Sequence, residues 1–188
     1  MQKDSVEELF RRTGAMLEGH FLLTSGLHSG VYWEKFRILQ SPELTQEVCR
    51  LIVDRFRGEG VGVVAGPALG GAVLAYEVAR QLEVKALYAE RGEEGRAFRR
   101  GQTISPGDKV LIVDDVLTTG GSLREMLEAV RSAGGRALGI GVVVDRSGGV
   151  DFGVPFFGCY RASAPTYRPE ECPLCRQGVR LQRLGSMR

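Results

Sequence analysis

The sequence predicts an α/β protein whose mainly parallel sheet is flanked by helices. Short, continuously apolar runs alternate with amphipathic stretches, and glycine-rich loops separate the two. Continuous apolar strands are typical of parallel sheets that are buried on both faces. The 188 residues are near the usual size of one domain. We expect a single domain over 1–188, with an N-terminal segment at 1–40, an α/β core at 41–160 and a basic, cysteine-containing tail at 161–188.

The N-terminal segment is expected to open with a helix over Asp4–Met16, because Val6, Leu9 and Phe10 share one helical face. From His20 to Leu39 the pattern becomes β-rich and irregular. This segment therefore lacks the regular alternation of the core.

The core is expected to begin with a helix that Ser41 caps and that has Pro42 in its first turn. Its apolar stripe consists of Leu44, Val48, Leu51, Ile52 and Phe56. The predicted strands that follow are VGVVAG, KALYAE, KVLIVDD, RALGIGVVVDR and PFFGCY. The stretch GGAVLAYEVARQL, and the residues from Leu123 to Val130, are predicted to be helices.

Composition excludes several classes of partner. The chain has 25 basic and 23 acidic side chains, for a net charge of +2, so it offers no overall field for nucleic acid or a membrane surface. No segment has a signal-peptide pattern, and no apolar run approaches the roughly 18 residues of a membrane span. We expect a cytoplasmic protein with small-molecule ligands.

The four cysteines are Cys49, Cys159, Cys172 and Cys175, and only the last two, in CPLC, have ligand-like spacing. A structural zinc ion needs two more thiolates or imidazoles. Cys49 lies in a helical stretch, and both histidines, His20 and His28, fall in the N-terminal segment, which has another plausible use. The sequence therefore favours reduced thiols in the tail and predicts no metal among the site residues. A zinc ion bound by the tail cysteines is the alternative.

The stretch VLIVDDVLTTGGS, Val110–Ser122, joins two acids to a loop of hydroxyls and glycines. Asp114 and Asp115 are predicted to lie at the carboxyl end of a strand, where ligands bind in open parallel sheets. The loop that follows can expose backbone N–H groups at the start of the next helix, which favours anions. The sequence therefore predicts a phosphate cradle beside two carboxylates.

Other phosphate motifs are absent from the sequence. It has neither GxxxxGK[ST] nor a GxGxxG that follows a strand. Two carboxylates beside an anion site suit a ligand with neutral hydroxyls as well as phosphate. A ribose 2,3-diol with a 5-phosphate meets both requirements.

This stretch resembles the phosphoribosyl pyrophosphate (PRPP) signature of the type I phosphoribosyltransferases. The resemblance implies a PRPP site made of the following residues: Asp114, Asp115, Val116, Leu117, Thr118, Thr119, Gly120, Gly121, Ser122 and Arg91. A strand that ends in an ordinary helix cap is the simpler alternative for the same residues.

The chain as a whole resembles the orotate phosphoribosyltransferases, particularly a bacterial subgroup with a cysteine-containing tail. The segment FLLTSGLHSGVYWEKFRIL is similar to the part of the family that forms a small hood over the base. The resemblance implies that orotate contacts Thr118, Arg146, Tyr32, Trp33 and Ser25, with Thr24 and Gly26 in the same turn. Arg146 can bind the orotate carboxylate in a bidentate manner. A surface ion pair of Arg146 with Asp145 and a core role for the two aromatic residues are the alternatives.

The family reaction transfers phosphoribosyl from PRPP to N1 of orotate in pyrimidine biosynthesis. The resemblance implies Mg²⁺ as cofactor and a homodimer in which the loop Arg91–Gly101 closes over the partner's PRPP. It makes Asp114, Asp115, Arg99 and Arg100 the candidate catalytic residues. This loop has arginines where the family commonly has lysines and histidine, so it is expected to clamp diphosphate rather than donate protons. An ordinary turn balanced by Glu93 and Glu94 is the alternative.

The segment Ala68–Gly71 follows a predicted strand and can offer amides to the diphosphate. Many family members have a lysine where Leu69 or Gly70 stands here, which weakens that contact. Two other functions remain open at this point. One is a purine phosphoribosyltransferase, since fold kinship alone does not fix the substrate. The other is a PRPP-sensing regulator that binds nucleic acid through the arginine-rich tail.

Overall fold

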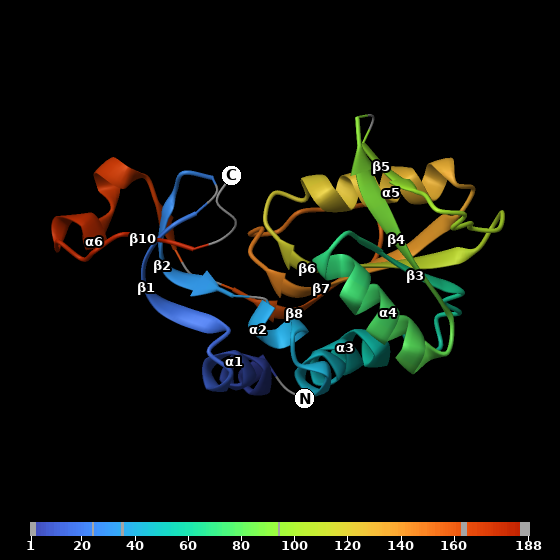
Figure 1. Cartoon of the computed structure of the whole chain (residues 1–188), viewed down its shortest axis with the longest axis horizontal. Helices are drawn as coiled ribbons and strands as arrows, with labels where there is room; N and C mark the ends of the chain where they lie inside the picture. The colour runs from blue at the N-terminus through green and yellow to red at the C-terminus, as the bar shows by residue number, and fades with distance from the viewer. Residues whose placement is uncertain (1–2, 24, 35, 94, 163–164, 185–188) are drawn as a thin grey trace.

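The computed structural model describes residues 3–23, 25–34, 36–93, 95–162 and 165–184. Within them the chain forms a six-stranded sheet in the order β5-β4-β3-β6-β7-β8 and a separate four-stranded sheet in the order β10-β1-β2-β9. Figure 1 shows the larger sheet with its helices on one side of the molecule and the smaller sheet on the other.

The large sheet confirms the predicted α/β core. Its strands are β3 (Val63–Pro67), β4 (Lys85–Gly92), β5 (Gly95–Phe98), β6 (Lys109–Leu117), β7 (Arg136–Asp145) and β8 (Phe156–Arg161). The pairs β4–β3, β3–β6, β6–β7 and β7–β8 are parallel, and only β5 is antiparallel to its neighbour β4. The helices are α3 (Pro42–Phe56), α4 (Gly70–Leu82) and α5 (Gly121–Ser132), as the sequence predicted to within a few residues.

The core consists of two apolar layers, one on each face of this sheet. Side chains alternate between the faces of a strand, so Leu111 and Val113 of β6 pack with the buried stripes of α3 and α4. Val110 and Ile112 face the opposite way and pack with α5. Helices on both faces explain why β6 is continuously apolar before its two acids.

The N-terminal segment forms α1 (Lys3–Arg12), β1 (Met16–Leu22), β2 (His28–Trp33) and α2 (Phe36–Leu39). The expected helix over Asp4–Met16 is wrong at its C-terminal end. Gly14 has φ +64°, a left-handed conformation that ends the helix. Met16 then starts β1 and pairs with Trp33. The apolar face that suggested the helix belongs to its first ten residues only.

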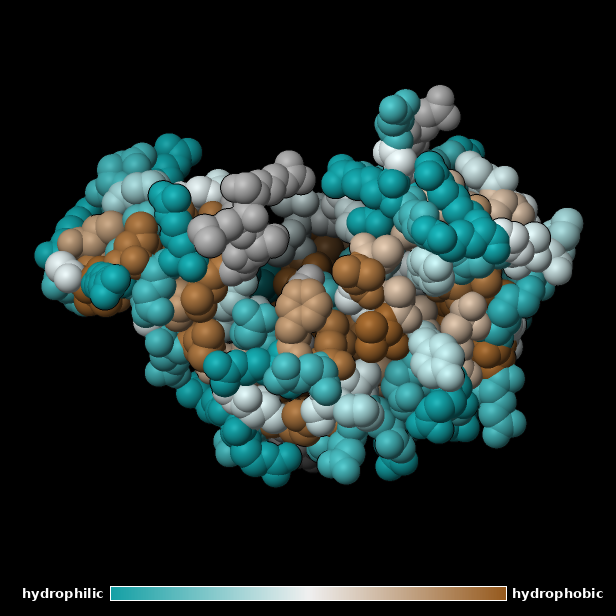
Figure 2. Space-filling view, viewed as in Figure 1, coloured by the Kyte–Doolittle hydropathy of each residue, from teal (hydrophilic) through white to brown (hydrophobic). Residues whose placement is uncertain are grey.

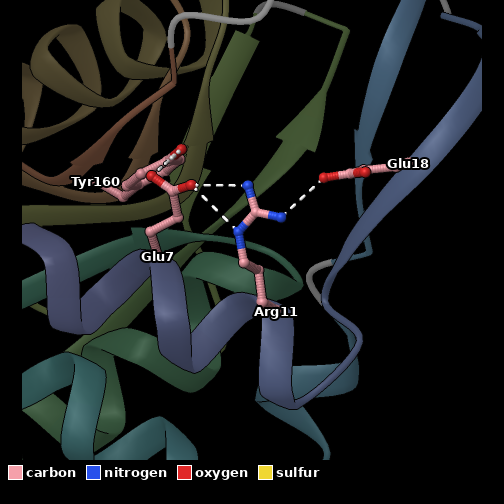
Figure 3. Close-up of polar contacts among 4 residues, drawn as sticks. All are labelled: Glu7, Arg11, Glu18 and Tyr160. Carbon is pink, nitrogen blue, oxygen red and sulfur yellow. Dashed lines mark hydrogen bonds and ion pairs between the residues drawn. The ribbon is translucent and has the colours of Figure 1, made fainter.

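A polar cluster joins this segment to the core (Figure 3). The Arg11 guanidinium contacts Glu7 Oε1 at 3.0 Å on α1 and Glu18 Oε1 at 2.8 Å on β1. The Tyr160 hydroxyl of β8 donates to Glu7 Oε2 at 3.2 Å. The hydrogen bonds with the two carboxylates raise the pKa of Arg11. The cluster ties α1 and the small sheet to the edge of the large one.

The tail returns to the small sheet. It contains β9 (Thr166–Tyr167), the 3₁₀ turn η1 (Pro169–Glu171), α6 (Pro173–Arg176) and β10 (Gln182–Arg183). β9 pairs with β2, and β10 pairs with β1, so the tail supplies both edges of this sheet. We call this sheet, with its connecting turn and α6, the hood. Among the described helices, none is long and apolar enough to cross a membrane.

Candidate active site

The predicted phosphate cradle lies where β6 passes into α5. Thr118 and Thr119 are exposed in the connecting bend, and Gly120 stands just before the helix with φ +84°. A Cβ atom on Gly120 would lie 3.1 Å from the Phe152 ring, so glycine is required both for its conformation and for its space. The bend and the amino end of α5 therefore present exposed backbone amides to an anion.

The two acids lie within β6, which continues to Leu117, two residues further than the sequence indicated. Asp114 and Asp115 are almost fully buried, with relative exposures of 7% and 6%. The Asp115 backbone N–H donates to Asp114 Oδ1 at 2.8 Å. Because consecutive strand residues face opposite sides, the two carboxylates approach the carboxyl edge of the sheet from its two faces.

The segment Ala68–Gly71 lies against Asp115. A Cβ atom on Gly70 would lie 1.8 Å from Asp115 Oδ2, and Leu69 beside it is exposed. The Ala68–Leu69 peptide bond is cis, and the Ala68 N–H donates to Ala89 O at 3.0 Å. A lysine at position 70 would collide with the carboxylate, which gives a physical reason for the glycine there.

Arg146 lies beside the cradle. Its backbone N–H donates to Leu117 O at 2.8 Å, which continues the pairing of β7 with β6 and places Arg146 next to Thr118. The guanidinium carbon lies 5.0 Å from the centroid of the Trp33 ring, a cation–π distance. Burial lowers the pKa of Arg146, and the nearby Tyr32 opposes that shift. Four of the five predicted orotate contacts, namely Arg146, Thr118, Trp33 and Tyr32, are thus gathered together.

The alternative ion pair of Arg146 with Asp145 is not formed. Asp145 is 2% exposed and instead contacts Arg161 Nε at 3.4 Å, while the Ser147 hydroxyl donates to its Oδ1 at 2.7 Å. The Asp145 carboxylate is therefore occupied by the turn that follows β7. The Arg146 guanidinium lies over the indole of Trp33 instead.

The hood residues differ in their access to ligand. Trp33 is 7% exposed and belongs to the core, and its buried Nε1 has no hydrogen-bond partner among the residues that the structure describes. A small apolar cavity is lined by Trp33 and Asp115 among others. Tyr32 is half-buried, and Ser25 is exposed in the turn between β1 and β2. Thr24 of the same turn lies outside the described residues. Trp33 is thus placed to support Arg146.

The predicted catalytic loop is largely a hairpin of β4 and β5, with Arg91 paired to Arg96. Arg91 Nη2 and Arg96 Nε lie 3.6 Å and 3.3 Å from the carboxylate oxygens of Glu125 on α5. Arg100 forms an ion pair with Glu90. These acids, rather than Glu93, are the partners of Arg91, Arg96 and Arg100, and Glu94 lies outside the described residues.

Arg99 differs from its neighbours in this hairpin. It has no ion pair within the described residues, and a Cβ atom on Gly92 would lie 2.4 Å from its Nη2. Its guanidinium lies across the hairpin next to Gly92 and is exposed. Arg99 is therefore the loop arginine whose charge is most available to an anion.

Comparison with known proteins agrees with this geometry. A family model described as "Phosphoribosyl transferase domain" matches residues 36–152. The chain is 49% identical over 187 residues to orotate phosphoribosyltransferase of Pelotomaculum thermopropionicum, with 99% of this chain and 98% of the relative covered. The enzyme of the same name from Caldanaerobacter subterraneus is 48% identical with the same coverage. The chain belongs to the orotate phosphoribosyltransferase family.

Solved structures show how far the fold is shared. Orotate phosphoribosyltransferase from Aeropyrum pernix has a TM-score of 0.70 and 27% identity, with 83% of this chain and 93% of that chain covered. Adenine phosphoribosyltransferase from Rhodothermus marinus has a TM-score of 0.67 at 20% identity, with 86% and 100% covered. The second likeness shows the fold alone, so the sheet by itself does not decide which base is bound.

Sequence reasoning missed two features of this region. It did not identify Glu125 as the partner of Arg91 and Arg96, because a glutamate within an amphipathic helix has no distinguishing local pattern. It also kept the two histidines apart from CPLC. The structure gathers His20, His28, Cys172 and Cys175 so that their ligand atoms all lie within 4.8 Å of one another. The signal available was that the chain has only two histidines and one Cys-x-x-Cys.

Proposed function

We propose that this chain transfers the phosphoribosyl group from PRPP to N1 of orotate, giving orotidine 5′-monophosphate and pyrophosphate in pyrimidine biosynthesis. The observation that carries the proposal is the hydrogen bond from the Arg146 backbone N–H to Leu117 O, which holds the Arg146 backbone beside the phosphate cradle, while the Trp33 ring holds its guanidinium. A cation in that place suits a base that carries a carboxylate. The identity with named orotate phosphoribosyltransferases supports the same reaction.

In the PRPP complex we place the 5-phosphate on the amides between Thr118 and Ser122, at the amino end of α5. The ribose diol then lies across the carboxyl edge of β6, where Asp114 and Asp115 accept its hydroxyl hydrogens. Their burial strengthens these contacts, because hydrogen bonds to a charged acceptor gain in a region with little water. The diphosphate faces Ala68–Gly71, with Arg91 at the rim of the site.

For orotate we assign the carboxylate to Arg146 and a base contact to Thr118. Tyr32 and Ser25 approach from the hood. Trp33, being buried, orients the Arg146 guanidinium from behind. Stacking on the indole restricts the rotamers of a long side chain, so less conformational entropy is lost when orotate binds.

The chemistry of this site is mainly electrostatic. Cleavage at the anomeric carbon places positive charge on the ribose and extra negative charge on the departing diphosphate. Asp114 and Asp115 lie on the ribose side, and Arg99 and Arg100 on the diphosphate side. Fixed charges of these signs stabilise the separated charge of the transition state. Arginine stays protonated, so the hairpin clamps diphosphate without transferring a proton.

Mg²⁺ fits this site as a substrate-bound ion. Within the described residues, the acids near the cradle do not form a group of three possible metal ligands, so protein alone does not build a cage for it. Asp114 and Asp115 are the carboxylates that can reach it, alongside diphosphate and ribose oxygens. When bound, the ion neutralises diphosphate charge.

We further propose a homodimer formed through α4 in which the hairpin serves the partner's site. Leu69, Val73 and Tyr76 form an exposed apolar stripe on this helix, with relative exposures of 78%, 44% and 68%. The spacing of these residues places them on one helical face. Their neighbour Arg100 lines the same surface depression as Val73 and Tyr76. Burying the stripe against a second copy would bring the loop to the partner molecule.

A cytoplasmic location agrees with the cysteines, which are free thiols in the structure. Figure 2 shows a hollow between the hood and the core, with hydrophobic side chains beside it on the core side. This appearance agrees with a small-molecule site.

The decisive assay follows loss of orotate absorbance with PRPP and Mg²⁺, in parallel with hypoxanthine and xanthine. Turnover of orotate alone is expected. Turnover of a purine base instead of orotate would show that the chain is a purine phosphoribosyltransferase. Tight PRPP binding without any turnover would favour a PRPP-sensing regulator.

A further inference from the structure

Four possible metal ligands from distant parts of the chain meet inside the hood. His20 lies in β1, His28 begins β2, and Cys172 and Cys175 flank the first turn of α6. His20 Nε2 lies 3.0 Å from His28 Nδ1 and 3.5 Å from Cys172 Sγ. Cys175 Sγ lies 3.7 Å from His20 Nε2 and 3.3 Å from His28 Nδ1. Every one of the four donor atoms is thus directed toward a common centre.

These distances match the edges of a zinc tetrahedron. Zinc bonds of about 2.0–2.1 Å to nitrogen and about 2.3 Å to sulfur imply edges of about 3.3 Å for two nitrogens and about 3.6 Å for nitrogen and sulfur. The observed separations are 3.0 Å for the nitrogens and 3.3–3.7 Å for nitrogen and sulfur. Because all four donors lie within 4.8 Å, the group suits one ion rather than a cluster of several.

The surroundings of His20 provide independent support. Its second ring nitrogen, Nδ1, lies 2.8 Å from the backbone carbonyl of Val179, which can only accept a hydrogen bond. Nδ1 therefore carries the proton, and the lone pair of Nε2 faces the cluster. A histidine that binds a metal commonly donates its other N–H to a carbonyl in this way. The tail thus supplies both a pair of thiols and the group that fixes the imidazole.

The local backbone accounts for this convergence. The register of β1 against β2 shifts between Glu18 and Phe21, a bulge that changes the direction of the intervening His20 side chain. Cys172 and Cys175 are separated by one helical turn, which places both sulfurs on the same side. His20, His28 and Cys172 are 1%, 4% and 0% exposed, whereas Cys175 is exposed. The site therefore lies just below the surface.

We propose that His20, His28, Cys172 and Cys175 bind one zinc ion that fastens the tail to the hood. Two thiolates and two imidazoles are a donor set typical of tetrahedral zinc. Four protein ligands leave no open position, which indicates a structural role rather than a catalytic one. The hood is small, with two-residue strands at both edges, so a cross-link between its first and last segments supplies stability that its apolar contacts lack.

The test uses the full chain without a histidine tag, purified without chelators and passed through gel filtration. Elemental analysis is expected to find about one zinc per chain. Replacement by Co²⁺ should give visible d–d bands of a tetrahedral site and a thiolate charge-transfer band in the near ultraviolet. Titration of the folded protein with a thiol reagent reports on Cys175, since the other three cysteines are buried. Its reaction should be slow in the loaded protein and fast after chelation.

The variant Cys172→Ser Cys175→Ser should lose the zinc and the cobalt spectrum. Glu170→Gln Glu171→Gln is the matched control, because it removes the two carboxylates nearest in sequence and keeps all four proposed ligands. That control should retain full zinc content. If the serine variant fails to fold, the wild-type chain still decides the matter through reversible loss of zinc and of thermal stability on chelation and their return with added Zn²⁺.

Two results would overturn the proposal. One is wild-type protein that carries less than about a tenth of an ion per chain after incubation with Zn²⁺. The other is zinc content that is unchanged in the serine variant. Both measurements are independent of orotate turnover, so failure of the zinc proposal and failure of the proposed reaction are distinguishable.

Discussion

The guanidinium of Arg146 lies over the indole of Trp33, with its carbon 5.0 Å from the ring centroid. Arg146 follows β7 and Trp33 ends β2, so this contact links the core, where we propose that PRPP binds, to the hood. It places a half-buried cation beside the cradle, with one face held by an aromatic ring. The proposed recognition of an acidic base therefore depends on this pair.

We expect Arg146→Ala to raise the KM for orotate by about 100-fold or more, since it removes a bidentate, charge-assisted contact of roughly 3 kcal/mol. Trp33→Leu should raise that KM by about 5- to 30-fold, in line with a partly buried cation–π contact of about 1–2 kcal/mol. The KM for PRPP should change little in both variants. Steady-state kinetics with each substrate varied in turn measures the split.

Arg55 is the matched control for this contact. It lies 4.9 Å from the ring centroid of Phe56 on α3, a similar interaction away from the cradle. Arg55→Ala should leave both KM values unchanged. Equal changes in the two KM values for Arg146→Ala would contradict its assignment to orotate.

Gly120 is expected to be essential for the shape of the phosphate cradle. Gly120→Ala places a methyl group 3.1 Å from the Phe152 ring at φ +84°. We expect a loss of roughly 2–3 kcal/mol in the free energy of unfolding, and PRPP affinity weaker by about tenfold or more. Urea denaturation and calorimetric titration with PRPP measure the two effects.

Gly107→Ala separates backbone strain from steric contact. Gly107 has φ +85° but nothing within 4 Å of a Cβ atom, so it reports the strain alone. Its cost should be about 1 kcal/mol, with PRPP affinity intact. If the two variants lose the same stability and bind PRPP equally, the Phe152 contact has no part in forming the cradle.

Among the hairpin arginines, Arg99 should matter most for turnover. Arg99→Ala is expected to lower kcat by about 100-fold because its charge is unpaired among the described residues and can stabilise the leaving diphosphate. Arg91→Ala removes a guanidinium that already contacts Glu125 and should cost less than about tenfold. A larger effect at Arg91 than at Arg99 would reverse this assignment.

A shared site can be tested by mixing two inactive proteins. One carries Arg99→Ala Arg100→Ala and the other Asp114→Asn Asp115→Asn. If loop and cradle come from different chains, a mixed dimer has one intact site, and random exchange should restore about one quarter of wild-type activity. No recovery after verified subunit exchange would show that each chain completes its own site.

The exposed stripe on α4 should control assembly. Val73→Glu Tyr76→Glu introduces charge into the proposed interface and should give a monomer by light scattering, with activity reduced at least tenfold. Leu181→Glu, at an apolar tail residue of 37% exposure, is the control and should remain dimeric. A double variant that stays dimeric would place the interface elsewhere.

Buried thiols predict a loss of stability in alkali. Burial raises the pKa of the Cys159 thiol to about 12, and it also raises the pKa of the Cys49 thiol. An unfolded thiol titrates near 8.5, so above about that pH the unfolded chain binds fewer protons than the folded one. The contribution of these two thiols to the free energy of unfolding is fully present below about pH 8.5. Above it, the free energy of unfolding falls by up to about 1.4 kcal/mol per pH unit for each thiol.

Urea unfolding at several pH values between about 8 and 10.5 measures this slope. Cys49→Ala Cys159→Ala should unfold more easily at neutral pH but lose less stability as the pH rises. The other titrating groups are common to both proteins, so they cancel in the comparison. Parallel slopes would show that these two thiols do not carry the effect.

The sequence by itself determined the alternating core and the ligand class. Strands that are buried on both faces must be continuously apolar, and the helices between them must have one apolar stripe. Both patterns can therefore be recognised within short stretches of the sequence. The acids at 114 and 115 and the turn of glycines that follows needed no tertiary information either, since the conformation of the turn is local; only the Phe152 ring that limits the space at Gly120 is a tertiary contact. The end of α1 was misplaced, because the left-handed Gly14 ends the helix, and β6 runs two residues further than the sequence indicated.

Tertiary structure decided which distant side chains meet. The stacking of Arg146 on Trp33, the pairing of two hairpin arginines with Glu125, and the approach of Cys172 and Cys175 to the histidines all join residues far apart in the chain. Such contacts depend on strand order, on the bulge at His20 and on the return of the tail to both edges of the hood. No local pattern encodes them, because the physical cause is the packing of whole elements.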